Sequence, residues 1–70
     1  MNEVNARLLV DQLKPLLKKS KSFMCKIDLD IDNEEIVIMN MFNAILWRLY
    51  YPNLRMIDAL YDISDYLIGR

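Results

Sequence analysis

The sequence predicts a small α+β domain that is mostly helical, in the order helix, strand or short hairpin, helix, helix. Three observations predict this fold: a helical apolar period before residue 20, a two-residue period over residues 23–31, and a renewed helical period from residue 38 onward. The chain has 70 residues, so we expect one domain over residues 1–70. At this length a single core only just holds a fold together.

The first predicted helix begins after Asn2, whose side chain is suited to cap it, and ends near Lys19 or Ser20. Its apolar face consists of Ala6, Leu9, Val10, Leu13, Leu16 and Leu17. Pro15 lies on the opposite, polar face and removes one backbone hydrogen bond. We therefore expect a kink or a restart of the helix at that residue.

A β-strand is predicted next, because apolar residues then recur at a strict spacing of two. They are Phe23, Cys25, Ile27, Leu29 and Ile31. A lone strand cannot satisfy its own backbone. Its partner is either residues 35–39, folding back as a hairpin, or the same strand in another copy of the chain.

Residues 33–51 carry two competing signals. The β-branched run at residues 36–39 favours the hairpin. Asp32 followed by Glu35 has the spacing of a capping box, and the apolar residues after Ile38 recur with a helical period. We expect a continuous helix over residues 33–51 and keep the hairpin as the alternative.

The third predicted helix follows Pro52, which ends the second, and Asn53 is suited to cap it. Its apolar face consists of Met56, Ile57, Leu60, Ile63, Ser64 and Leu67. Gly69 is a natural C-terminal stop. The short connection predicts that the last two helices pack as a hairpin.

The composition excludes several classes of site. The chain has no histidine, one cysteine (Cys25) and one glycine, which argues against an acid–base catalyst, a zinc site and a phosphate-binding loop. Asp28, Asp30 and Asp32 match the start of a calcium-binding loop, but its later glycine and glutamate positions are not matched. We therefore predict no enzymatic activity, no metal, no cofactor and no small-molecule substrate.

The same composition bears on location. The longest uncharged stretch, residues 36–47, is shorter than a membrane span, and charges interrupt residues 1–13, so neither a membrane segment nor a signal peptide is predicted. A small secreted domain would carry several disulfides. The single Cys25 indicates a reducing compartment, and we expect a cytoplasmic protein.

Charge is unevenly distributed along the chain, although the net charge is only −1. Residues 1–26 hold six of the nine basic residues, and residues 27–70 hold eight of the ten acidic ones. This is not the overall basic character of a nucleic-acid-binding protein. The candidate charged docking residues are Lys14, Lys18 and Lys19 on the first helix and Asp58, Asp62 and Asp65 on the third. Ordinary solvated helix faces are the alternative explanation.

A candidate partner-binding surface comes from aromatic and amide side chains. One tryptophan and four tyrosines are more than a 70-residue core is expected to hold, and these residue types are enriched in interface hot spots. The candidate residues form a stripe on the second predicted helix, joined by one tyrosine of the third: Ile36, Asn40, Asn43, Trp47, Tyr51 and Tyr61. The alternative is a core tryptophan with tyrosines around its rim.

The function predicted from these features is a small non-catalytic protein–protein interaction module, an adaptor, inhibitor or regulator of a larger protein, that forms a homodimer. The second hypothesis is a DNA-binding regulator, because the order strand–helix–helix over residues 23–68 is similar to that of ribbon–helix–helix repressors. The outward strand residues include Asp28 and Asp30, which phosphate repels, so nucleic acid is the less favoured partner. The residue usage is typical of AT-rich genomes, and compact proteins of this size are frequent among phage and viral accessory proteins.

Overall fold

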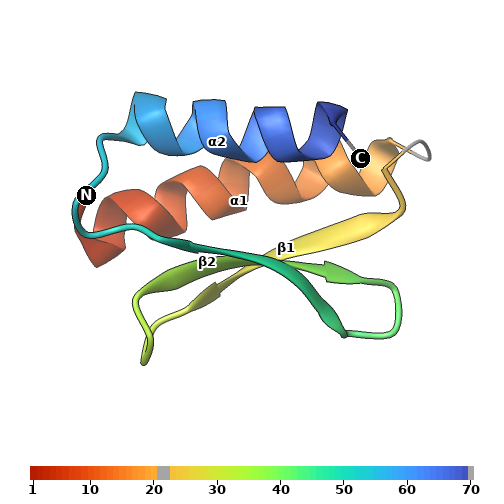
Figure 1. The fold of residues 1–70 in the computed structure, drawn as a ribbon, viewed down its shortest axis with the longest axis horizontal. Coiled ribbons are helices and arrows are strands. Elements are labelled where there is room, and N and C mark those ends of the chain that lie inside the picture. Colours follow the sequence, from red (N-terminus) through yellow and green to blue (C-terminus); the bar gives the residue numbers. More distant parts are fainter. Residues whose placement is uncertain (21–22, 70) are drawn as a thin grey trace.

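A computed structural model describes residues 1–20 and 23–69 and shows a three-stranded antiparallel sheet with a helix before it and a helix after it. Both helices lie on the same face of the sheet, and the other face is uncovered (Figure 1). The strands are adjacent in chain order, β1-β2-β3. The elements are α1 (Glu3–Lys19), β1 (Cys25–Asp30), β2 (Glu35–Asn40), β3 (Ile45–Tyr50) and α2 (Met56–Ile68).

The predicted order helix–strand–helix–helix is wrong. Residues 33–51 form two strands and not a helix. The hairpin alternative predicts the first of these strands, over residues 35–39, but not the second. The β-branched residues Ile36, Val37 and Ile38 favour a strand, and their pairing gives β1 a hydrogen-bonded neighbour within one chain. The strand–helix–helix similarity to ribbon–helix–helix repressors is lost with the second helix. Because β2 pairs with β1 in the same chain, the need of β1 for a partner strand no longer argues for a dimer.

The turn between β1 and β2 explains the misleading capping signal. The amide and side-chain nitrogens of Asn33 donate to the two carboxylate oxygens of Asp30, at 3.3 and 2.7 Å. Glu34 then adopts a left-handed backbone conformation, with φ 54°. The acidic and amide residues of this segment therefore close a hairpin turn, which they do as readily as they begin a helix.

A β-bulge explains why β3 has the apolar pattern of a helix. Ile38 is opposite Trp47 and Met39 is opposite Ile45, so Leu46 is an extra residue in β3. The extra residue shifts the alternation of side chains by one position. Apolar residues consequently recur at spacings of three and four, although the backbone is extended.

The cap and the extent of the first helix agree with their predictions, but the helix does not restart at Pro15. The Asn5 amide donates to the Asn2 side chain at 2.8 Å, which confirms the cap, and the helix runs through Pro15 to Lys19. Four residues of the predicted face are buried in the core, whereas Leu16 is exposed. Within residues 1–20 and 23–69, neither helix has the length and apolarity that crossing a bilayer would require.

The last helix forms where a third helix was predicted, with a different cap and a rotated face. Arg55 occupies the N-cap position without a side-chain cap, so the prediction for Asn53 is wrong. The buried residues are Ala59, Ile63 and Leu67, whereas Ile57 and Leu60 are exposed. The ring of Trp47 on β3 stacks on that of Tyr66 on α2, with centroids 5.1 Å apart. The main core lies between the helices and the sheet, around the fully buried Ile36, Ile38 and Ile63.

Candidate interaction surface

The connection between β2 and β3 is held in one conformation by the side chain of Asn40. Its Oδ1 accepts hydrogen bonds from the amides of Phe42 and Ala44, at 2.9 and 3.0 Å. The Asn40 amide also donates to the Ala44 carbonyl at 2.9 Å. Asn43 adopts a left-handed conformation, with φ 67°, which asparagine tolerates better than most residues. This turn is therefore built to present a defined shape.

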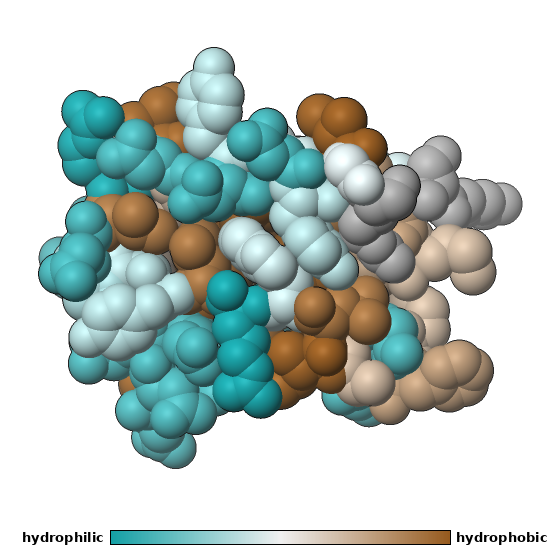
Figure 2. Space-filling model, viewed as in Figure 1, coloured by the Kyte–Doolittle hydropathy of each residue, from teal (hydrophilic) through white to brown (hydrophobic). Residues whose placement is uncertain are grey.

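Large apolar side chains are exposed at this end of the sheet. We call Met24, Met41, Phe42, Ile45 and Leu46 the hairpin-end cluster; all five are exposed, and Phe42 is 90% accessible. Figure 2 shows apolar side chains gathered at the end of the molecule that carries the β2–β3 connection. Monomeric proteins rarely leave connected apolar surface uncovered unless it binds something.

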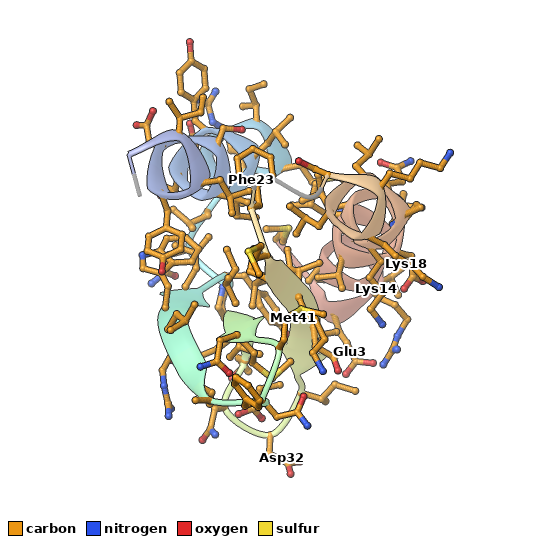
Figure 3. All side chains as sticks on the ribbon, turned by 90° about the vertical axis from the view of Figure 1, so that its right-hand side faces the viewer. Glu3, Lys14, Lys18, Phe23, Asp32 and Met41 are labelled. Carbon is orange, nitrogen blue, oxygen red and sulfur yellow. The ribbon has the colours of Figure 1, made fainter. Side chains whose placement is uncertain are left out.

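A groove of about 750 Å³ adjoins the cluster and runs between the second half of α1 and β1. Met24 and Met41 belong to both the cluster and the groove. In Figure 3, Lys14 and Lys18 lie on the α1 side of the groove, and Met41 lies on the sheet side. The other apolar lining residues are Leu17, Cys25, Ile27 and Met39. Methionine side chains are flexible and adapt to partners of different shape.

Three lysines and one aspartate line this groove, so it is basic in a chain whose net charge is negative. Lys14 Nζ lies 3.6 Å from Asp28 Oδ1, and Lys26 donates to the side chain of Asn43. Lys18 has no ion-pair partner among the residues that the structure describes. The β1–β2 turn at the opposite end of the sheet is acidic, and Figure 3 shows Asp32 there.

The stripe predicted from the sequence does not form one surface. Ile36 and Tyr51 are buried, and Trp47 is half-buried against α2. Burial raises the pKa of the Tyr51 hydroxyl, and the Glu34 carboxylate adds to this shift. Asn40, the last residue of β2, and Asn43, in the β2–β3 connection, are at the interaction surface, and Tyr61 is exposed on α2, outside the groove.

The predicted charged residues are divided between two places. Lys14 and Lys18 line the groove, whereas Lys19 is exposed and does not line it. Asp62 and Asp65 are exposed on α2, which does not line the groove. Asp58 accepts a hydrogen bond from Arg55 at 2.9 Å, and this bond lowers the pKa of the Asp58 carboxyl. The structure therefore brings the lysines, but not the aspartates, to the candidate site.

Sequence reasoning missed the central residues of this surface, Met41 and Phe42, by assigning them to a helix. The signal that marks them is the pair Asn40 and Asn43, since asparagine next to a short apolar pair is typical of a turn. Within residues 1–20 and 23–69, no group of three or more acidic, cysteine or histidine side chains is placed to hold a metal ion. Comparisons with protein-family models, curated proteins and solved structures found no match.

Proposed function

We propose that this chain is a small, non-catalytic protein–protein interaction module that binds its partner through the hairpin-end cluster and the adjoining groove. The observation that carries the proposal is the nearly complete exposure of Phe42 on a turn that Asn40 holds in place. An aromatic side chain on a rigid support loses little conformational entropy when it is buried by a partner. Aromatic residues, phenylalanine among them, are enriched in protein–protein interfaces.

The groove supports the same proposal by offering a concave surface next to the anchor. Its volume of about 750 Å³ lies within the range of ligand-binding clefts. Because Met41 belongs to both features, a partner that covers Phe42 also reaches the groove. A role in the cytoplasm is part of the proposal, since the buried and unpaired thiol of Cys25 suits a reducing compartment.

Self-association remains a prediction with a narrower basis. The exposed apolar cluster still calls for a covering surface, and a second copy of the chain is one source of it. Sedimentation equilibrium over a wide range of protein concentrations measures the mass in solution. A mass that rises toward twice that of the chain, and does not rise in Phe42→Ser, would identify a homodimer through this cluster.

The binding proposal is tested by comparing three baits in an extract of the source cell: the parent chain, Phe42→Ser, and Tyr61→Ser as the matched control. Tyr61 is 67% exposed and lies on α2, so its replacement removes a comparable aromatic from another surface. We expect one or more proteins to be retained by the parent and the control and lost by Phe42→Ser.

The dissociation constant of a retained protein is then measured with purified components. Loss of a hot-spot side chain costs at least about 2 kcal/mol, so we expect binding to Phe42→Ser to be weaker by about 30-fold or more. The proposal is wrong if Phe42→Ser binds as well as Tyr61→Ser.

A further inference from the structure

The backbone orientation of β1 follows from the hydrogen bonds of its neighbour β2. The Asn40 amide donates to the Ala44 carbonyl, and the Glu34 carbonyl accepts from the Tyr51 amide. Even-numbered residues between 34 and 40 therefore direct their amides and carbonyls toward β3. Odd-numbered residues of β2 therefore face β1. Given the register, Lys26 and Asp28 bond to β2, whereas Cys25, Ile27 and Leu29 direct their amides and carbonyls outward.

The groove lies along this outward edge. Cys25 and Ile27 line it, and their side chains point to the core side of the sheet, while Lys26 and Asp28 line it from the uncovered face. The groove therefore follows both sides of the β1 edge, with Leu17 of α1 as one wall. An added strand would place successive side chains alternately on these two sides.

We infer that the groove receives an extended, acidic and apolar segment of a partner protein, which adds to the sheet as a fourth strand beside β1. The inference rests on the proposed function and specifies its partner. Because its side chains alternate, the apolar ones would contact Leu17 on the core side, and the carboxylates would reach Lys26 on the uncovered face and Lys18 at the wall of the groove. A segment of about six residues matches the length of β1.

Asp28 occupies part of this edge and competes with the segment. Its Oδ1 accepts a hydrogen bond from the Leu29 amide at 2.8 Å and lies 3.6 Å from Lys14 Nζ, so it engages an outward amide and a groove lysine together. When an acidic segment binds, the Lys14 ammonium group would leave Asp28 and pair with a carboxylate of the partner. Asp28→Asn should therefore strengthen binding several-fold, because it removes a negative charge from the groove.

The test uses an eight-residue peptide that carries fluorescein at its N-terminus and alternates aspartate with leucine and valine; the full chain is titrated into it and binding is followed by fluorescence anisotropy. A second peptide with asparagine in place of aspartate is the ligand control. Lys18→Glu removes the lysine without an ion-pair partner among the described residues, and Lys19→Glu is the matched protein control, because Lys19 does not line the groove. Amide exchange of Ile27 is followed by NMR with and without peptide.

We expect the aspartate peptide to bind, Lys18→Glu to weaken it about tenfold, Lys19→Glu to leave it unchanged, and the Ile27 amide to become protected. Absence of binding, equal effects of the two lysine variants, or an unprotected Ile27 amide would overturn the inference. Binding to phosphatidylserine vesicles without binding to the peptide would assign the surface to a membrane instead. If a protein partner still depends on Phe42 but not on Lys18, the proposed function stands and the strand-addition inference fails.

Discussion

Replacing Asn40 with alanine tests whether the turn that presents Phe42 is held by one side chain. The substitution removes the acceptor of two hydrogen bonds, from the amides of Phe42 and Ala44. A hydrogen bond contributes about 0.5–1.5 kcal/mol, and these two are exposed to solvent, so we expect a loss of about 1–2 kcal/mol in the free energy of unfolding. For a domain of this size such a loss lowers the melting temperature by roughly 5–10 °C.

Urea denaturation followed by circular dichroism measures the stability, and NMR amide exchange of Phe42 and Ala44 measures the local order. Asn40→Asp is the matched control, because it keeps a side-chain oxygen in the same place. We expect both amides to exchange faster in Asn40→Ala and to stay protected in Asn40→Asp. If the two variants differ by less than about 0.5 kcal/mol and their amides exchange equally, the Asn40 side chain does not hold the turn.

Three further predictions concern the core, alkaline pH and the first turn. Ile38→Ala should lower the free energy of unfolding by about 3 kcal/mol, because Ile38 is fully buried. Ile45→Ala, at an exposed position, should lower it by less than about 1 kcal/mol in the same denaturation assay. Equal losses would contradict the observed strand register. Burial raises the folded-state pKa of Tyr51, so its contribution to stability is complete below the unfolded pKa of about 10 and is lost as pH rises through the folded value. Thermal melts between about pH 9 and 12 should therefore show a smaller loss of stability in Tyr51→Phe than in the parent, and parallel curves would refute this. Glu34→Gly should raise the free energy of unfolding by up to about 1 kcal/mol, because glycine adopts the left-handed backbone conformation of residue 34 without strain. Asp32→Gly removes the same charge elsewhere in the turn and should not stabilise the fold. Identical effects of the two variants would point to the lost charge as the cause.

Helix α1 and strand β1 were predictable because local signals and tertiary packing agree there, whereas α2 was predicted in the right place but with another cap and another buried face. Asn2 caps α1 as its side chain predicts, and the apolar period of that helix matches its buried face. The period of β1 likewise matches its buried residues, Cys25 and Ile27. In these elements one apolar face determines both the conformation and the side that is buried.

The two other strands were not predictable from the same signals. The acidic residues before Glu35 fit a helix cap and a hairpin turn equally well, and the extra residue Leu46 gives β3 the apolar spacing of a helix. The deciding factor is tertiary, because β1 needs a hydrogen-bonded neighbour and β2 supplies it within the chain. From the sequence that requirement leaves two partners open, because the same strand of another copy would pair with residues 25–30 as well.

The candidate site was missed for the same reason, since a helix over residues 33–51 places Phe42 in the core. In the structure, Phe42 lies at the end of a hairpin and not on a packed face. The lysines were recognised as a possible docking group, but their meeting with Met41 across β1 depends on the sheet. Chain order alone does not bring α1 and the β2–β3 connection together.

Cross-saturation NMR on the complex with a purified partner tests most directly whether the hairpin end is the interaction surface. Saturation passes from the partner to the atoms of this chain that it touches. We predict that it reaches Met41, Phe42 and the groove residues of α1 and β1, and that it spares the acidic face of α2 at Asp62 and Asp65. Saturation confined to α2, with Phe42 unaffected, would contradict the account.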